Sequence, residues 1–436
     1  MTAYLSSTIV LLTVIITAGI LLFYRPLIIS SSWRALITPL ASIMGSGFLV
    51  CAPLLYANTG NYAIFAMITL LLLAYAVGSV IRFNIQYGEA LFENQTSTPD
   101  NIREEHRLHI SHRNAVHSVG EKKTYALLEK FSHFVLAGAY CISVSYYLQL
   151  LASFALQSIH GDHEWYGKAM VTIILSGIAL IGTTKGLKGI ERLERTVVSV
   201  NLAMITALLV GLIYHNGTLI NNGTWVLHHA SVPQDKLHIF RVLMGMLIIV
   251  QGFETSRFLG SEHPREQRIR TMKWAQIISS SIYILFIALM AVVINNADSS
   301  NDSGITAIIN LSSIIAPVLP ILITVTAIGS QFSASTADDA GCSGLLEAFF
   351  KGTRLSRFNY IIVTVMAVIL TWLTDVYRII SFASQAFAFY YALQCIIGAI
   401  VLKKVSNVPS FKFKAFMFWT LAIICISITF FGIPAG

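Results

Sequence analysis

The sequence predicts an all-α protein that crosses a membrane about twelve times. Three observations lead to this prediction. The 436-residue chain is 55% hydrophobic and only 11% charged, whereas a soluble domain is about 25% charged. Apolar runs of about twenty residues, enough for a helix to span a bilayer, recur along the whole chain. The mean hydropathy is +0.70, and the longest polar stretch, about 92–123, is too short for a soluble domain of useful size.

The apolar runs define the expected helices, with boundaries good to about four residues. The first run has no basic residue before it, since Arg25 is the first in the chain, so we expect it to be retained and not cleaved as a signal peptide. In order, the expected spans are 4–24, 35–56, 61–88, 125–158, 168–184, 193–214, 238–260, 272–294, 314–343, 357–374, 377–402 and 412–433.

The basic residues predict the orientation of these spans. If the connection 25–34 lies in the cytoplasm, all but four of the 29 Lys and Arg residues fall on the cytoplasmic side. This is the bias that orients membrane proteins, and it places both termini outside the cytoplasm in a plasma or inner membrane. The net charge of +8 is therefore a topology signal. Its expected partners are anionic lipid headgroups and not nucleic acid. The four exceptions are Lys168, Lys236, Arg241 and Arg378.

Gly45-Ser46-Gly47 lies in the second span, where a membrane helix should be most regular. Glycine weakens a helix, and a helix inside a bilayer opens only where protein, water or a ligand satisfies the freed backbone groups. Such an interruption is a pointer to a transporter's binding site, because freed N–H groups can hold an anionic group. The alternative is close helix packing, which small residues also favour.

Glu254 lies late in the seventh span, directly after Gly252-Phe253. A carboxylate within a span costs about 2.5–3.5 kcal/mol at the helix centre, so its default interpretation is functional. We expect a second helix break here and a proton-linked or gating role for Glu254. In the alternative, Glu254 pairs with Arg257, three residues on, and caps the helix.

The ninth span carries hydroxyls at Thr326, Ser330 and Ser333, which share one helix face. Such a face can offer oxygen ligands to a hard cation such as Na⁺, or the hydroxyls can bond back to their own helix. Asp338 and Asp339 come late in this span, so we expect them near the cytoplasmic interface with a gating or capping role.

Together these motifs resemble the amino acid–polyamine–organocation (APC) transporter superfamily. The resemblance rests on the GSG break, on GFE five spans later with the basic loop SEHPREQRIR, and on TADDAGCSGLLEAFFKG, and it covers about residues 32–404. It implies the leucine-transporter (LeuT) fold, with two inverted five-helix repeats at 32–215 and 236–404, each opening with a discontinuous helix. Residues 1–31 would be an extra N-terminal helix and 405–436 a peripheral one, whereas the family usually has both extra helices at the C-terminal end.

The resemblance also implies site residues. Core helix 1 would line the substrate site with Ile43, Gly45, Ser46 and Gly47, and core helix 6 with Gly252, Phe253 and Glu254. Tyr140, Ser143 and Tyr147 share a face of core helix 3, where the fold often has an aromatic lid; simple packing is the alternative. In sodium-coupled members a cation lies between core helices 1 and 8. The matching positions here are the carbonyls of Ala41 and Met44 and the hydroxyls of Thr326 and Ser330.

For the coupling ion, proton-coupled members can place a lysine of core helix 5 in the cation position. The span 196–215 has no lysine, so Glu254 is the better proton candidate, with Asp338 and Asp339 as gating residues.

The leading functional prediction is a secondary transporter of a small organic solute, an amino acid or related amine, coupled to Na⁺ or H⁺. One alternative is transport of K⁺ or a divalent metal on the same fold; His106, His109 and His112 have helical metal-ligand spacing but are expected in a cytoplasmic loop. Another is a membrane solute sensor that does not transport. The chain has no phosphate-binding glycine loop, metal triad or nucleophile–base set, so we expect no enzyme, and no cofactor beyond the coupling Na⁺.

The five cysteines lie in or beside apolar spans without CxxC spacing, so we expect packing residues. They are Cys51, Cys141, Cys342, Cys395 and Cys425.

Overall fold

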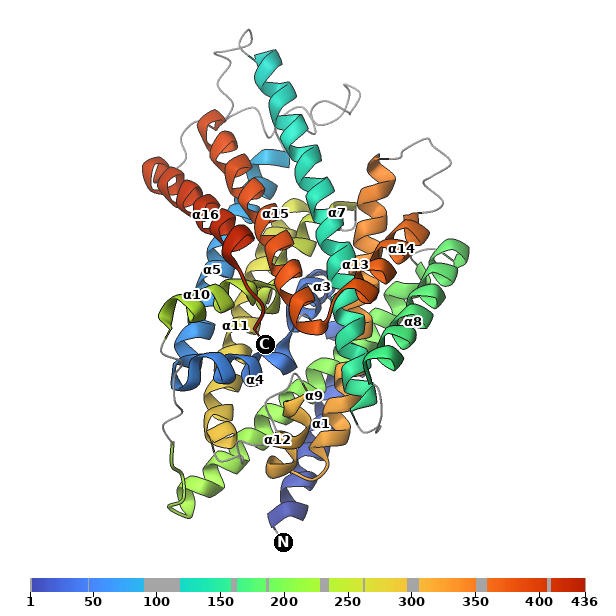
Figure 1. The fold of residues 1–436 in the computed structure, drawn as a ribbon, viewed down its shortest axis with the longest axis vertical. Helices are drawn as coiled ribbons and strands as arrows, with labels where there is room; N and C mark the ends of the chain where they lie inside the picture. The colour runs from blue at the N-terminus through green and yellow to red at the C-terminus, as the bar shows by residue number, and fades with distance from the viewer. Residues whose placement is uncertain are drawn as a thin grey trace.

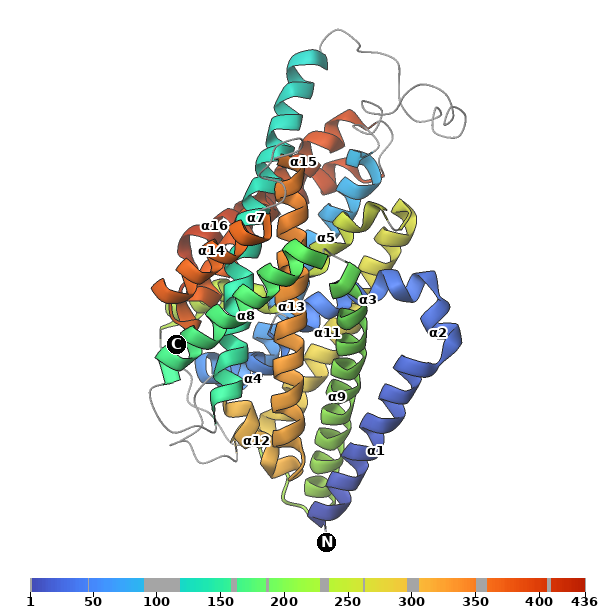
Figure 2. The ribbon, with the colours of Figure 1, turned by 90° about the vertical axis from the view of Figure 1, so that its right-hand side faces the viewer.

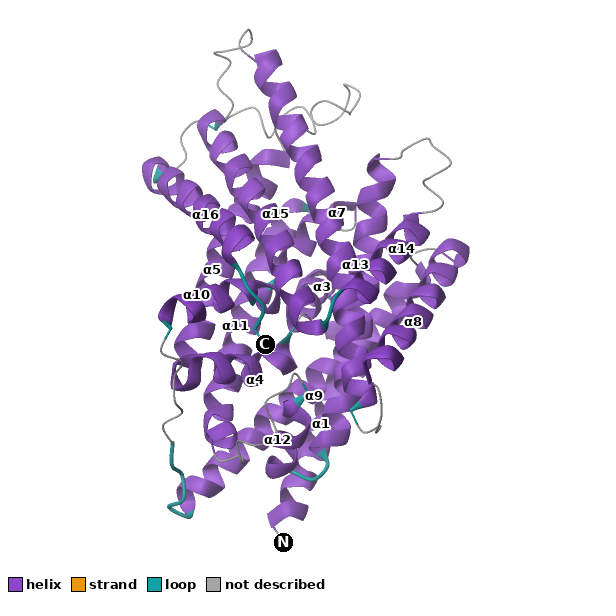
Figure 3. Ribbon diagram, viewed as in Figure 1, coloured by secondary structure: helices purple, strands orange, loops and turns teal. Residues whose placement is uncertain are grey.

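All regular structure in the described residues is helical, which confirms the predicted class (Figure 3). The computed structural model describes residues 2–45, 47–89, 118–157, 163–185, 188–227, 235–261, 263–295, 306–349, 359–405 and 409–435. The histidine cluster predicted in the loop before the fourth span lies outside these residues.

A helical stretch occupies each predicted span. In the first half of the chain these are α1 (Thr2–Phe23), α2 (Arg25–Ile29), α3 (Ser31–Gly45), α4 (Phe48–Thr59), η1 (Gly60–Tyr62), α5 (Ala63–Phe83), η2 (Asn84–Gly88), α7 (Ser118–Leu156), α8 (His163–Lys185) and α9 (Lys188–Asn221). In the second half they are α10 (Lys236–Gly245), η3 (Leu247–Val250), η4 (Phe253–Ser261), α11 (Arg265–Asn295), α12 (Ala307–Ile315), α13 (Leu319–Phe349), α14 (Asn359–Leu373), α15 (Val376–Lys404) and α16 (Phe411–Phe431).

The helices form a membrane-embedded bundle. Eight helical stretches among the described residues are long and apolar enough to cross a bilayer. Large apolar side chains such as Ile15, Phe65 and Phe430 are exposed on the outer helices, as expected of surfaces that face lipid and not water. The protein is therefore a multi-pass integral membrane protein. The count of twelve spans and the orientation stay predictions.

The first and last helices lie outside the central bundle. α1 runs beside α9 (Figure 2), and its buried Val10 packs against Gly211, where a Cβ would lie 3.1 Å from the valine Cγ2. α16 packs along α15 (Figure 1). The interrupted pairs α3–α4 and α10–η3–η4 pack against the longer helices α11, α13 and α15.

The predicted ninth span begins too early. The span predicted from residue 314 is two helices, because α12 ends at Ile315 and α13 begins at Leu319. Ala316 between them is extended (φ −156°, ψ 136°), the backbone conformation that the following Pro317 favours. The predicted span therefore included the last turn of a separate helix that the sequence analysis left in a loop.

Candidate transport site

The first break lies where the GSG motif predicts it. α3 ends at Gly45 and α4 begins at Phe48; Ser46 lies outside the described residues. A Cβ on Gly47 would lie 3.0 Å from Cγ1 and 3.1 Å from Cα of Ile249. A Cβ on Gly45 would lie 3.1 Å from that of Ala334 in α13. The helix break and the close helix packing, proposed as alternatives, are thus both present.

The second break follows η3 and separates α10 from η4. Gln251 is extended (φ −84°, ψ 177°), and Gly252 has φ +115°, a conformation open mainly to glycine. A Cβ on Gly252 would also lie 2.6 Å from the carbonyl carbon of Ser42 and 2.7 Å from the Ile43 nitrogen. The backbones of the two breaks are therefore in direct contact.

One tyrosine of α11 joins the two breaks. The hydroxyl of Tyr283 lies 3.0 Å from the carbonyl oxygen of Ile43 and 2.7 Å from that of Ile249. Both carbonyls are buried beside an interruption, where a backbone acceptor without a partner is costly. Tyr283 thus supplies a donor that the broken helices lack, and it positions α3 against η3.

Glu254 is fully buried at the second break. Its Oε2 accepts hydrogen bonds from the Gly252 amide (3.0 Å) and the Tyr391 hydroxyl (2.8 Å). Its Oε1 has no hydrogen-bond partner among the described residues. The neighbouring Phe253 stacks on the Tyr391 ring at a centroid distance of 5.2 Å. The alternative pairing with Arg257 is wrong, because Arg257 forms an ion pair with Glu129 of α7 instead.

The predicted face of α7 lies against the second break and against α13. The Tyr147 hydroxyl accepts a hydrogen bond of 2.8 Å from Gln251 Nε2, and the Ser143 hydroxyl donates to Asp338 of α13. Tyr140 is buried against Phe387, with ring centroids 5.8 Å apart. A Cβ on Gly341 would lie 3.2 Å from the Tyr140 ring, so this glycine leaves room for the tyrosine.

Asp338 and Asp339, which the sequence places near the cytoplasmic interface, are enclosed by protein. Their exposed fractions are 2% and 1%, and α13 continues to Phe349. Neither oxygen of Asp339 has a hydrogen-bond partner among the described residues. Asp338 instead reaches Ser143, within the group of residues expected to line the substrate site.

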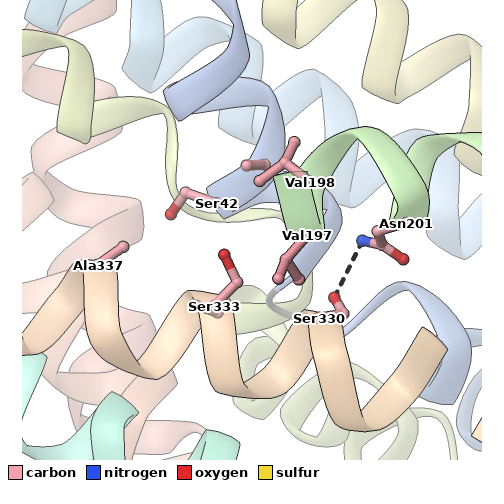
Figure 4. A pocket seen from close by; sticks show the side chains of 9 residues that line it. Ser42, Val197, Val198, Asn201, Ser330, Ser333 and Ala337 are labelled. Atoms are coloured by element: carbon pink, nitrogen blue, oxygen red, sulfur yellow. Dashed lines mark hydrogen bonds between the residues drawn. The ribbon is translucent and has the colours of Figure 1, made fainter. Parts of the chain in front are cut away.

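A small cavity lies between α3, α9 and α13, and two of the four residues predicted to bind the cation line it (Figure 4). Its volume suits about one water molecule. Ala41 and Ser330 line it as expected, whereas Met44 and Thr326 do not. The Thr326 hydroxyl donates to Leu322 O of its own helix (2.6 Å), which is the alternative that the sequence analysis left open. The lining residues are Ala41, Ser42, Val197, Val198, Asn201, Ser330, Ser333, Ala334 and Ala337.

Asn201 of α9 is a residue of this cavity that the sequence analysis missed. Its Nδ2 donates to the Ser330 hydroxyl at 3.1 Å (Figure 4). Its Oδ1 is buried without a hydrogen-bond partner among the described residues. An amide within an otherwise apolar span was the signal that could have identified it.

The chain matches the APC superfamily transporter family over residues 25–106 and 101–432. It belongs to this family. An uncharacterized protein of Aquifex aeolicus (strain VF5) is 38% identical to this APC transporter over 408 residues, covering 92% of this chain and 90% of the relative.

Solved structures of a manganese transporter of Eremococcus coleocola share the fold of this APC transporter. Its complex with an aromatic bis-isothiourea substituted compound gives a TM-score of 0.52 at 12% identity, covering 94% of this chain and 86% of that one. A mutant of the same transporter gives a TM-score of 0.53 at 11% identity, covering 92% and 87%. At this identity the likeness concerns the fold alone.

An ionic network of two buried arginines and two half-buried glutamates lies beyond Glu254 in this APC transporter, and no sequence motif predicted it. Arg257 of η4 donates to Glu129 of α7 and to Gln394 of α15. Arg268 of α11 donates to the Arg257 carbonyl (2.9 Å) and to Glu89 (2.7 Å). The network joins η4 to three other helices. Residue spacing in the sequence could not predict this network, because its members are far apart in the chain.

Proposed function

We propose that this APC transporter is a secondary transporter of a small organic solute with an amino group, either an amino acid or a related amine. The observation that carries the proposal is Glu254, a buried carboxylate beside a helix break with one oxygen free of hydrogen bonds among the described residues. Its known partners are an amide and a hydroxyl. A buried carboxylate without a cation is costly, and an ammonium group of the solute or a proton would relieve that cost.

The breaks supply the other half of the proposed site. The amides of Gly45–Gly47 would hold a carboxylate, because a helix N-terminus favours an anion. Tyr147 and Gln251 would contact the solute between the breaks. Gly252 now packs against Ser42, so the solute enters only when the interrupted helices separate. We propose that they do so by alternating access within two five-helix repeats, 32–215 and 236–404.

Two groups are candidates for ion coupling. Glu254 would bind and release H⁺ with each transport cycle. Alternatively, Na⁺ would occupy the cavity beside Ser330, where the hydroxyls of Ser330 and Ser333 and the free Oδ1 of Asn201 offer oxygen atoms, the ligand type that hard cations prefer.

A second candidate function is transport of an inorganic cation, either K⁺ or a divalent metal. Two features favour it. The solved transporter that shares the fold moves manganese according to its name, and Glu254 and Asp339 each carry buried oxygens without a hydrogen-bond partner among the described residues. In this alternative the carboxylates would coordinate the cargo itself.

Uptake into proteoliposomes tests the proposal. A thermal-shift screen of amino acids, amines, K⁺ and Mn²⁺ selects ligands, because a bound ligand stabilises the folded state by mass action. Uptake of each selected ligand is then measured under Na⁺ and pH gradients. Uptake of an amino acid or amine supports the proposal; uptake of K⁺ or Mn²⁺ alone supports the second candidate. Binding without uptake of any ligand indicates a sensor.

The Glu254→Gln variant tests the role of the carboxylate. We expect uptake to be lost, or to lose its dependence on pH, while the protein remains folded. The matched control is Glu164→Gln, because Glu164 is an exposed carboxylate at the start of α8. Full uptake with an unchanged pH profile in Glu254→Gln contradicts the role assigned to Glu254.

A further inference from the structure

The residues after α16 turn back into the bundle. Figure 1 shows this end of the described chain among the helices, near α4 and α10, and not at either end of the molecule. Gly432 and Ala435 are buried, and Gly432–Ala435 has no regular secondary structure. Non-helical backbone at membrane depth is stable only where protein satisfies its polar groups. The partners of this segment therefore show what it does.

Three elements hold the segment by its main chain. The Ile433 amide donates to the Arg241 carbonyl of α10 at 3.1 Å. The Gly432 carbonyl accepts from Gln385 Nε2 of α15 at 2.8 Å. The Ala435 carbonyl accepts from Asn58 Nδ2 of α4 at 2.9 Å. A single short segment thus joins α4 and α10, which are halves of the two interrupted helices, and attaches both to α15.

A glycine of α10 makes this contact possible. A Cβ on Gly245 would lie 2.0 Å from the Ile433 carbonyl oxygen, a distance that no side chain could accept. Arg241 adds a bond from its Nε to the Phe431 carbonyl at 3.1 Å. Next to Gln385, the Ser384 hydroxyl donates to the Gly245 carbonyl at 2.7 Å, so the end of α10 and the segment share one support on α15.

We propose that Gly432–Ala435 is a strap that keeps α4 and α10 together and closes the transport site toward their side of the membrane. The site opens on that side when the strap leaves Gly245 and Asn58. The strap holds α10, which precedes the second break, whereas the Arg257–Glu129 network holds η4, which follows it. Its role in transport rests on the proposed alternating access, but its mechanical role can be measured without any cargo.

Hydrogen–deuterium exchange of the purified full chain in lipid nanodiscs tests the strap. Asn58→Ala and Gln385→Ala each remove one of its bonds, and Gly245→Val places a side chain where the Ile433 carbonyl lies. We expect amide exchange in α4 and α10 to rise together, by about fivefold for each bond removed. The matched controls are Asn222→Ala, at an exposed turn residue, and Gly177→Val, where a Cβ has no neighbour within 4 Å.

Asn58 also donates to Leu54 of its own helix, so exchange in α10 is the deciding readout for that variant. Unchanged exchange in α10 for both Asn58→Ala and Gln385→Ala overturns the strap, even if α4 alone becomes more labile. If exchange in α10 rises as expected but the wild-type protein takes up no solute, the proposed function is contradicted and the strap is still supported.

Discussion

At the scale of single residues, the site depends on glycines that permit backbone contact. Gly252 combines φ +115° with a backbone approach to Ser42 that leaves no room for a Cβ. Gly47 allows the first break to contact Ile249, because a Cβ there would lie 3.1 Å from the Ile249 Cα. Both glycines thus permit close approach of the backbone, and Gly252 is in addition required by its positive φ.

We predict that Gly252→Ala destabilises the protein. A side chain at this φ costs about 1–3 kcal/mol, and the close approach to Ser42 adds to it. Gly177→Ala is the matched control, because Gly177 lies within α8 with open space around its Cβ, where alanine favours the helix by about 0.5–1 kcal/mol. Thermal unfolding of the purified variants should therefore show opposite shifts. Equal melting temperatures would contradict the conformational role of Gly252.

At the scale of helices, buried polar pairs decide which elements hold together. Arg257 is 8% exposed and pairs with Glu129 across the η4–α7 contact. Removing one partner of a buried ion pair leaves a charge without compensation, whereas removing both can be nearly neutral. The network thus locks η4 in place and must separate if η4 moves during transport.

We predict that Arg257→Leu destabilises the protein, by up to about 3–5 kcal/mol, because the half-buried Glu129 loses its arginine partner and keeps only His133 at 3.3 Å. The double variant Arg257→Leu/Glu129→Leu should be markedly more stable than the single one. A double-mutant cycle on chemical or thermal unfolding measures this coupling. Additive losses in the double variant would show that the two side chains do not act as a pair.

The cavity between α3, α9 and α13 allows a prediction about coupling. If Na⁺ binds there, Asn201→Ala removes one oxygen and should raise the Na⁺ concentration needed for half-maximal uptake by about tenfold, since a lost contact to a charged ligand is worth about 1.5–3 kcal/mol. Thr326→Val is the control, because Thr326 does not line the cavity. Uptake that is independent of Na⁺ in both variants would leave Glu254 as the coupling group.

At the scale of the whole molecule, the two interrupted helices meet at the centre and are held on both sides. Tyr283 and Gly252 join the breaks, the Arg257 network holds η4, and Gly432–Ala435 holds α4 and α10. These contacts hold the elements before and after the second break. Alternating access would release one set of contacts at a time, so we expect strap variants and network variants to favour opening on opposite sides.

The sequence by itself determined the helical membrane class, the family and the positions of both breaks, because each depends on local signals. These signals lie at the positions whose structure they predict. They are the apolar runs of bilayer length, the glycines within a span and the carboxylate of Glu254. The start of α13 was missed although its signal, Pro317, is also local. The burial of Asp338 and Asp339 could not be predicted, because it depends on where α13 lies among its neighbours.

Only the tertiary structure decided which residues meet. Asn201 faces Ser330, Arg257 bonds to Glu129 and not to Glu254, and Gly245 accommodates Ile433. Each of these pairs joins elements far apart in the chain. The hydrogen bonds and the steric fit between them leave no regular spacing in the sequence from which they could be predicted. The sequence does not identify the cargo for the same reason. The proposed site consists of backbone groups of two broken helices and a few buried side chains, and these meet only in the folded bundle.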